Sequence, residues 1–320
     1  MYSKSFLRRF FFFVLFIGLI YGAGRLYFHL TAGFSLENIS SDLTYQPQWQ
    51  VPEPSEKENG EINQALAQPY YYLGKGCQSY VFLSQNGSYV MKFFKYQRFR
   101  IAPWLRYFPP LPAIVAYRKE KEKEKWQRLN AFATSLTIAA KRLKKESGLV
   151  YLHLNKTDHL NKKVVIEDKI GRVYTLDIDQ MEFSIQKRAD LLCDVLSNYQ
   201  KQGQVKESYQ LIDRLLALLV SEYRRGLADN DHALMQNTGV VDKEPIHIDV
   251  GRFEELEEVK NPAKYHQELF TKCYHFHQWL KVNDPAVSLY LEKKLKEIIG
   301  PKYHIMKPIW YEKPARDALL

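Results

Sequence analysis

Three polar residues in the second half of the chain have side-chain oxygens that could bind a cation or accept hydrogen bonds. Asp231 lies in the acidic loop GLADNDHALMQN, Asn237 ends that loop, and Asp249 lies in the otherwise apolar segment IHIDV. A carboxylate in an apolar strand needs a cation or hydrogen-bond donors nearby, and carboxylate oxygens are ligands that Mg²⁺ prefers. A cation or hydrogen-bond donors are therefore expected beside Asp249. The alternative is that Asp249 only caps the turn before Gly251.

Lys92 is the candidate for a cationic partner of phosphate groups. It lies in the apolar segment VMKFF, where a lysine is uncommon unless its ammonium group has an anionic partner. Before it comes the pattern G-x-G-x-x-S-x-V, formed by Gly74, Gly76, Ser79 and Val81. Glycines at these positions allow backbone N–H groups to approach phosphates closely. An Asn-Gly pair between the two segments predicts a hairpin turn, which would place Lys92 one strand away from the glycine loop.

These segments together resemble the protein-kinase-like superfamily. The resemblance covers about residues 70–253. It is carried by the glycine pattern, the V-x-K strand, the acidic loop and the motif H-I-D-x-G, which is similar to that of the phosphoinositide kinases. It implies ATP and Mg²⁺ (or Mn²⁺) as cofactors. The residues that it implies for nucleotide binding are Gly74, Gly76, Ser79, Val81 and Lys92.

The resemblance also implies catalytic roles in phosphoryl transfer. Asp231 takes the role of the base that orients the acceptor hydroxyl, and Asn237 and Asp249 take the roles of metal ligands. The sequence departs from the family pattern in two places. Asp231 and Asn237 are six residues apart where the family has five, and Val250 stands where protein kinases have Phe.

A kinase also holds its strand lysine with a glutamate on a helix, and residues 114–147 form the strongest helical pattern in the chain. Within it, Glu122 lies four residues before Trp126 and seven before Leu129, which mark the face predicted to be buried. We therefore expect Glu122, rather than the two neighbouring glutamates, to pair with the lysine as part of the catalytic set. The alternative is that all three glutamates lie in a solvated run of charges.

The predicted fold class is α+β, with two lobes of the protein-kinase-like type. Residues 70–183 are predicted to form a small antiparallel β lobe with one long helix, because short β-rich runs recur on both sides of the helical segment. Residues 184–320 are predicted to form a mostly helical lobe with the catalytic loop and the metal motif. Amphipathic patterns within it predict helices near 205–225, 262–282 and 285–299.

Residues 1–30 are predicted to be a membrane anchor or a signal segment, and residues 31–69 a polar linker. The uncharged run 10–24 has a length between that of a signal-peptide core and that of a full transmembrane helix. Snorkelling of Arg25 would extend the span to Leu30, so a retained signal-anchor is favoured over a cleaved signal or a buried core helix. Three basic residues before the run, against Arg25 after it, favour a cytoplasmic N-terminus with the bulk of the chain outside.

The segment 93–112 contains seven aromatic residues, four basic residues and no acidic residue. The favoured interpretation is that the aromatic side chains pack on the small lobe while the arginines are solvated. The first alternative is a surface that contacts anionic lipid, for which this mixture is typical. Binding of single-stranded nucleic acid is the least favoured alternative, because no nucleic-acid module is evident elsewhere. The net charge of +10 also favours anionic partners.

The whole sequence favours a membrane-anchored, kinase-like, ATP-dependent phosphotransferase. Only 69 residues follow Gly251, and they contain no activation segment for protein substrates, so a lipid, a glycan or another small molecule is favoured as acceptor over a protein. The alternatives are a catalytically inactive pseudokinase that acts as a membrane-associated scaffold, and an anchored structural protein. With 46% hydrophobic residues and three cysteines, the chain is neither wholly disordered nor a disulfide scaffold.

Overall fold

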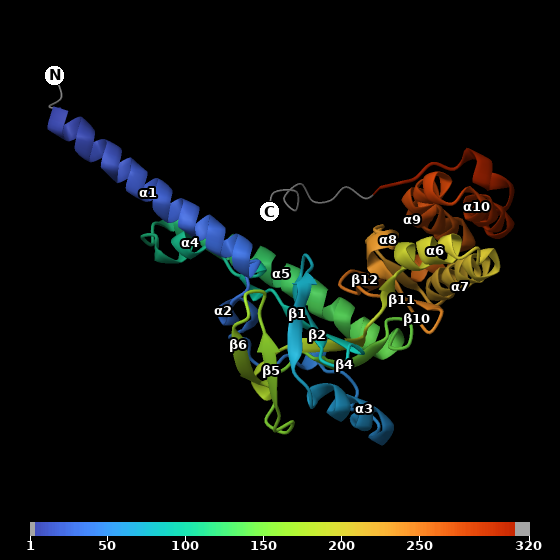
Figure 1. The fold of residues 1–320 in the computed structure, drawn as a ribbon, viewed down its shortest axis with the longest axis horizontal. Coiled ribbons are helices and arrows are strands. Elements are labelled where there is room, and N and C mark those ends of the chain that lie inside the picture. Colours follow the sequence, from blue (N-terminus) through green and yellow to red (C-terminus); the bar gives the residue numbers. More distant parts are fainter. Residues whose placement is uncertain (1–3, 311–320) are drawn as a thin grey trace. The chain divides into compact units, whose positions relative to one another are not determined.

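The computed structural model describes residues 4–310 and confirms the α+β fold class (Figure 1). The α-helices are α1 (Lys4–Thr31), α2 (Leu36–Ile39), α3 (Glu56–Leu66), α4 (Pro103–Tyr107), α5 (Pro112–Arg142), α6 (Leu192–Lys201), α7 (Val205–Arg224), α8 (Leu234–Asn237), α9 (Pro262–Asn283) and α10 (Pro285–Ile299). The strands are β1 (Tyr70–Lys75), β2 (Ser79–Ser84), β3 (Tyr89–Phe94), β4 (Leu149–His153), β5 (Lys163–Glu167), β6 (Val173–Asp177), β7 (Phe183–Lys187), β8 (Asp190–Leu191), β9 (Leu227–Asp229), β10 (Thr238–Val241), β11 (Glu244–His247) and β12 (Phe253–Glu255). Short 3₁₀ helices cover Pro47–Trp49, Tyr96–Arg98, Ile178–Gln180, Glu257–Lys260 and Gly300–Ile305.

Seven strands form one sheet in the order β4-β7-β3-β2-β1-β5-β6. The neighbours β1, β2 and β3 are antiparallel, and so are β5 and β6, but β1 and β5 run parallel, with Tyr70 opposite Ile166. The sheet is therefore mixed, and the prediction of an antiparallel sheet is wrong in this respect. The physical reason is that β5 follows β1 through a long connection that includes α5, and such a crossover allows two parallel strands to pair. Two small sheets have the orders β11-β10-β8 and β12-β9.

The chain divides into two compact units. The first comprises the residues up to Tyr45 together with Gly60–Lys125 and His153–Phe183, and the second comprises Gln46–Asn59, Trp126–Leu152 and the residues from Ser184 onward. Strands β1, β2, β3, β5 and β6 belong to the first unit, and helices α6 to α10 belong to the second. The nucleotide-binding candidates therefore lie in the first unit, and the catalytic-loop and metal candidates lie in the second.

The core of the first unit is built largely from aromatic side chains on the sheet. Tyr70, Phe82 and Phe93 are buried, and the rings of Phe82 and Phe93 meet edge to face with centroids 5.8 Å apart. Phe93 also contacts Phe183, whose ring centroid is 6.1 Å away. Aromatic side chains bury a large apolar area per residue, and their use in this core accounts for part of the high aromatic content of the chain.

Four helices, α6, α7, α9 and α10, supply the core of the second unit. Buried leucines recur at helical spacing along α7 at Leu211, Leu215 and Leu219, and they pack in one cluster with Leu269 and Phe276 of α9. Helices α9 and α10 each begin with a side-chain cap followed by proline, which is preorganised for the first helical turn. The three helices predicted in this part of the sequence are confirmed.

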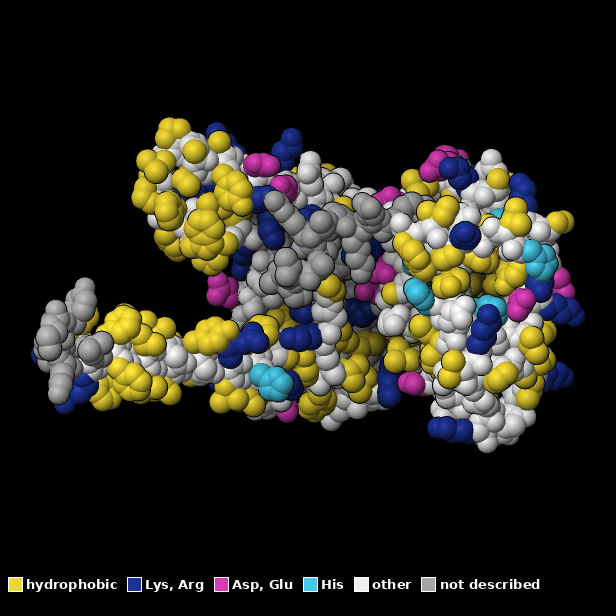
Figure 2. Space-filling view, turned by 90° about the horizontal axis from the view of Figure 1, so that it is seen from above, with side chains coloured by type: hydrophobic (Ala, Val, Ile, Leu, Met, Phe, Trp, Pro, Cys, Tyr) yellow, Lys and Arg dark blue, Asp and Glu magenta, His cyan; other side chains and the backbone are white. Residues whose placement is uncertain are grey.

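Helix α1 is long and apolar enough to cross a membrane. Residues Arg8–Thr31 have a mean hydropathy of 1.8, and the apolar side chains of this run are exposed, for example Phe16 at 60%. Figure 1 shows α1 as a straight helix that projects from the first unit, and Figure 2 shows its apolar side chains on the surface. By length and composition α1 is a candidate membrane span, and its exposure contradicts the alternative of a buried core helix.

The segment 31–69 is packed rather than loose, which corrects the expectation of a loosely packed linker. Phe34 and Ile39 are buried in the first unit. Trp49 is buried in the second unit, where it stacks on Trp126 with ring centroids 5.8 Å apart. The segment is polar on average, but Phe34, Ile39 and Trp49 each face a core. A composition averaged over the segment conceals them.

A tight turn joins α1 to the sheet of the first unit. Gly33 has a φ of 74°, in the left-handed region that favours glycine, and its carbonyl accepts a hydrogen bond from the Tyr80 hydroxyl. Phe34 follows and packs against Tyr80, Phe82 and Tyr174, with ring centroids 5.3, 5.4 and 5.8 Å from its own. Phe34 thereby fixes the end of α1 to the sheet.

We expect Phe34→Ala to destabilise the first unit by about 3–5 kcal/mol, because removal of a buried ring leaves a cavity. Hydrogen exchange of the β2 and β6 amides, measured on the full chain in detergent, should accelerate accordingly. Phe16→Ala is the matched control, since that ring is 60% exposed on α1. Unchanged protection in the Phe34 variant would show that this contact does not stabilise the unit.

Candidate functional site

Gly74, Val81 and Lys92 lie in one row across three neighbouring strands. Gly74 of β1 is opposite Val81 of β2, and Val81 is opposite Lys92 of β3. Residues directly opposite one another in a sheet have their side chains on the same face. Among the described residues, and leaving its two chain neighbours aside, no atom lies within 4 Å of the point where a Cβ atom of Gly74 would be. The row therefore combines open space over a glycine with a cationic side chain two strands away.

The tip of this hairpin is closed by its own backbone and contacted by two cationic side chains. The Gly76 N–H donates to Ser79 O (2.9 Å), so this amide is used inside the hairpin. Lys95 Nζ donates to Gly76 O (2.6 Å), and Arg98 Nη1 donates to Cys77 Sγ (2.8 Å). Sequence reasoning identified Gly76 and Ser79 as candidates but missed Lys95 and Arg98. Their only signal was the cluster of basic residues that follows β3.

Lys95 is buried among other cations. The residue is 8% exposed, and its ammonium group lies 4.6 Å from the centroid of the Tyr80 ring. Burial, followed by repulsion from Lys75 and Arg98, lowers the pKa of Lys95 to about 8. The hairpin tip therefore carries concentrated positive charge that an anionic ligand would neutralise.

Glu122 is exposed on α5, so the expectation that it lies on a buried face is wrong. In this part of α5 the side chain of Trp126 is still 40% exposed, and the buried residues of the helix begin at Leu129. The neighbouring Glu124 forms an ion pair with Lys121 (2.7 Å). The helix was predicted correctly, but the side of it that carries Trp126 is not buried in this part of α5. The pairing of Glu122 with the strand lysine stays a prediction.

In the second unit, Asn237 and Asp249 lie at the paired ends of β10 and β11. These strands are antiparallel, and just beyond their ladder the Ile248 N–H donates to Asn237 O (2.8 Å). Asp249 is exposed, and its Oδ1 accepts a hydrogen bond from the Gly251 N–H (3.1 Å). This bond is the turn-capping contact that the sequence left open as an alternative. This hydrogen bond uses one oxygen of the Asp249 carboxylate. The β10–β11 hairpin brings Asn237 and Asp249 to the same end of its ladder.

Asp231 lies in the loop between β9 and α8. Its Oδ1 accepts a hydrogen bond from the Ala233 N–H (3.0 Å), and its Oδ2 is 3.7 Å from Arg252 Nε. This side-chain-capped turn leads directly into the short helix α8, which ends at Asn237. The turn and the helix together accommodate the six-residue spacing that departs from the family pattern.

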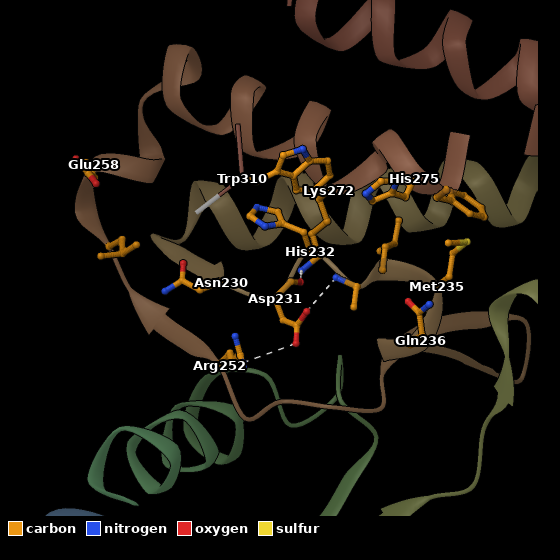
Figure 3. Close-up of a pocket in the computed structure, with 14 residues that line it drawn as sticks. Asn230, Asp231, His232, Met235, Gln236, Arg252, Glu258, Lys272, His275 and Trp310 are labelled. Carbon is orange, nitrogen blue, oxygen red and sulfur yellow. Dashed lines mark hydrogen bonds and ion pairs between the residues drawn. The ribbon is translucent and has the colours of Figure 1, made fainter. Parts of the chain in front are cut away.

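Asp231 lines a cavity of about 920 Å³ that lies within the second unit. Figure 3 shows Asp231 directed toward Arg252, while His232 and Trp310 lie together on the opposite side. Trp310 stacks on His275 with ring centroids 4.7 Å apart. A cavity of this size with a few polar groups and an aromatic wall is suited to a small-molecule ligand.

A buried ion pair anchors the acidic loop to α9. Lys272 Nζ lies 2.5 Å from Asp229 Oδ2, and the two side chains are only 3% and 4% exposed. The same ammonium group donates to Asp231 O (3.1 Å), and Asp229 Oδ1 accepts from the Asp231 N–H (3.0 Å). Sequence reasoning missed this pair, because a lysine in a helix is usually solvated and gives no signal of a distant partner.

Buried polar contacts also hold the turn that carries the metal motif. The Ser135 hydroxyl, on α5, donates to Val250 O (2.5 Å) and accepts from the Phe253 N–H (2.6 Å). His247, at the end of β11, lies 2.7 Å from Glu222 of α7, and both side chains are buried. These contacts satisfy backbone groups on both sides of the turn and tie it to two helices. Neither Ser135 nor Glu222 was predicted.

The assignment of Asn237 and Asp249 as Mg²⁺ ligands stays a prediction, although both side chains carry oxygen, the ligand type that Mg²⁺ prefers. Mg²⁺ commonly binds through one or two carboxylates together with substrate phosphates. Within residues 4–310, no group of three or more His, Cys, Asp or Glu side chains is arranged to hold a metal ion.

No family model and no curated protein matches this chain. The resemblance to kinases therefore stays a prediction that rests on the motif residues. In the first unit the strand pairing brings together Gly74, Val81 and Lys92. In the second unit a hairpin brings together Asn237 and Asp249.

Lys272→Met is expected to destabilise the second unit by about 3–5 kcal/mol, because it leaves the buried Asp229 carboxylate without its cation. Hydrogen exchange of the α9 and β9 amides in the full chain reports this loss. The control is Lys294→Met, whose partner Asp213 is 44% exposed, so its loss should cost less than about 1 kcal/mol. Equal effects of the two substitutions would contradict the anchoring role.

The lowered pKa of Lys95 predicts a distinct dependence of stability on pH. Between its folded pKa of about 8 and its ordinary pKa of 10.5 the unfolded chain binds one more proton, so stability should rise with pH across that range. Urea unfolding of the full chain in detergent at several pH values measures the slope. The Lys95→Met variant keeps the apolar stem but lacks the titrating group, so it lacks this rise in stability. Its free energy of unfolding relative to that of wild type should therefore fall as pH rises from about 8 to 10. A pH-independent difference would contradict the prediction.

Proposed function

We propose that this protein is a membrane-anchored, ATP-dependent phosphotransferase of the protein-kinase-like type. The observation that carries the proposal is the row of Gly74, Val81 and Lys92 on adjacent strands. It corresponds to the arrangement in which kinases cover the nucleotide with a glycine loop and bind its phosphates with a strand lysine. In this proposal Lys92 binds the phosphates, and the open face above Gly74 accommodates the nucleotide.

The second unit supplies the remaining roles in the proposal. Asn237 and Asp249 would hold Mg²⁺, which neutralises the charge that develops on the transferred phosphoryl group. Asp231 would orient the acceptor hydroxyl and accept its proton, because its carboxylate lines the cavity where an acceptor can bind. Arg252, 3.7 Å from that carboxylate, would hold it in position before the acceptor arrives.

Contacts at the end of α1 support an acceptor that lies in or near the membrane. Lys75, between the two motif glycines, donates from Nζ to Ala32 O (2.7 Å), and its ammonium group lies 4.8 Å from the centroid of the Phe28 ring. The glycine hairpin is therefore next to the end of the candidate span. If α1 crosses a bilayer, phosphoryl transfer takes place close to the membrane surface, which favours a lipid or a lipid-linked glycan.

A pseudokinase scaffold is the alternative, and specific contacts favour it. The Gly76 N–H is used within the hairpin. The Asp231 carboxylate already accepts from Ala233 and lies near Arg252. A chain that binds nucleotide without transferring phosphate would share these features, so binding and transfer must be measured separately.

ATP with Mg²⁺ is expected to stabilise the full chain in a thermal-shift series by about 2.7 kcal/mol at a hundredfold excess over the dissociation constant. Lys92→Ala and Asp249→Ala should abolish the shift, because each removes a charge that the phosphates or the cation require. Lys123→Ala, an exposed lysine on α5, is the matched control and should keep it. No shift in the wild type, or a full shift in Lys92→Ala, would refute the nucleotide site.

Asp231→Asn separates the enzyme from the scaffold. It should retain the thermal shift and lose at least about 100-fold of the transfer of radiolabelled phosphate to membrane lipid extracts, the usual cost of removing a general base. A wild-type chain that binds ATP but labels neither lipid nor protein would establish the scaffold instead.

A further inference from the structure

Helix α4 presents an apolar face to the surroundings of the first unit. Leu105 is its one buried residue, whereas Trp104, Tyr107 and Phe108 are 58%, 82% and 46% exposed. Leu111, just beyond the helix, is 57% exposed. Exposed apolar side chains clustered on one short segment are typical of a surface that contacts a partner or a membrane.

Specific contacts hold this segment in place, so the exposure is not that of a loose loop. Arg118 of α5 donates to Leu105 O (3.1 Å) and to Phe108 O (3.2 Å), and thereby satisfies carbonyls in and after α4. On the other side, Arg100 donates to Glu37 O (3.0 Å) and Ser40 O (2.6 Å) of the α2 region. The fold uses two arginines to fix a segment whose aromatic side chains point away from the core.

The backbone of the segment is suited to an environment with little water. Four prolines, at 103, 109, 110 and 112, have no N–H group that would need a partner. Arg118 accounts for two of the carbonyls. Because an unpaired polar backbone group is costly in lipid, both features lower the free-energy cost of bringing α4 to the boundary between headgroups and acyl chains.

The positive charge of the chain around α4 favours a membrane that contains anionic lipid. From Ile62 to Lys119 the chain contains eight Lys or Arg residues and no Asp or Glu. One of them, Arg106, is exposed in the last turn of α4. Basic residues beside Trp and Tyr are the combination found at the surface of anionic leaflets, where the rings lie at headgroup level.

The position of α4 relative to α1 agrees with a membrane partner. Figure 1 shows that α4 extends from the same end of the first unit as α1, and Figure 2 shows apolar side chains gathered at the position of α4 as well as along α1. The end of α1 is surrounded by polar contacts: Lys169 donates to His29 O (3.1 Å), and Arg172 donates to the Tyr27 hydroxyl (2.9 Å). These contacts are expected where a span leaves the hydrocarbon region.

We propose that the α4 segment, residues 99–111, inserts its aromatic face into the headgroup region of the anionic leaflet from which α1 emerges. This inference rests on the proposed membrane anchor and adds a second contact to it. Two contacts, unlike one, fix the rotation of the first unit about α1. They therefore hold the glycine hairpin at a constant orientation to the membrane surface.

The test uses the full chain in lipid nanodiscs with an environment-sensitive fluorophore (NBD) at Tyr107→Cys, in a Cys77→Ser background. Cys273 is buried, and burial raises the pKa of the Cys193 thiol to about 11, so both label slowly. In discs that contain phosphatidylserine, the emission should shift to shorter wavelength and be quenched several-fold more by lipids spin-labelled near the headgroup than in the control. The control is NBD at Val282→Cys, which is 83% exposed on α9.

A second variant tests the aromatic face without a probe on it. Trp104→Ser combined with Phe108→Ser leaves the buried Leu105 and the Arg118 contacts in place, and should increase hydrogen exchange at residues 99–111 in discs but not in detergent. A water-like NBD signal at position 107 would overturn the proposal, and so would an equal signal in phosphatidylcholine discs. A shift that occurs in detergent and depends on protein concentration would indicate another copy of the chain and would also overturn it.

The membrane anchor itself is tested independently, by resistance of the chain to alkaline extraction from vesicles. If the chain resists extraction but position 107 stays in water, only the α4 contact is wrong. If the chain is extracted, the anchor proposed above fails, whatever the NBD signal shows.

Discussion

The buried ion pair between Asp229 and Lys272 is the interaction on which the candidate catalytic region depends. Two charges that are 3% and 4% exposed have lost nearly all of their hydration, so each is tolerated only while the other is in place. The lysine also donates to Asp231 O, and the Asp229 carboxylate accepts from the Asp231 N–H. The backbone of Asp231 is therefore held on both sides by a pair that cannot separate cheaply. Its own carboxylate is left to face the cavity.

Buried polar contacts position the turn that carries Asp249 by the same physical principle. Ser135 both donates to and accepts from the backbone of the Asp249 turn, and an apolar replacement would leave two buried polar groups unpaired. His247 and Glu222 fix the preceding strand to α7. The residues that would do the chemistry are exposed or half-buried, whereas the residues that fix them are buried. Such a division keeps reactive oxygens accessible without leaving them mobile.

The sequence allowed the local parts of this arrangement to be predicted, because they depend on neighbours along the chain. The hairpin around the Asn-Gly turn aligned Val81 with Lys92, and the amphipathic leucines of α7 formed a core as their spacing indicated. The ion pair joins residues 43 positions apart and the Ser135 contact spans 115 positions, and a lysine or serine in a helix gives no sign of such a partner. Glu122 failed for a related reason: helical spacing gives relative faces, and only tertiary packing decides which face is inward. The parallel pairing of β1 and β5 likewise depends on a long crossover that no local pattern encodes.

The acid-free stretch from Ile62 to Lys119 connects the two proposed functions of the first unit. It contains the glycine hairpin and α4, and no carboxylate in it offsets its cations. Burial, followed by repulsion from Lys75 and Arg98, lowers the pKa of Lys95, and a phosphate group would supply a counterion to this cluster of cations. Screening limits such effects to about 10 Å at moderate salt, which means that lipid headgroups near α4 neutralise only their own neighbours. A nucleotide phosphate and an anionic leaflet would therefore each neutralise the cations nearest to it on the same basic surface.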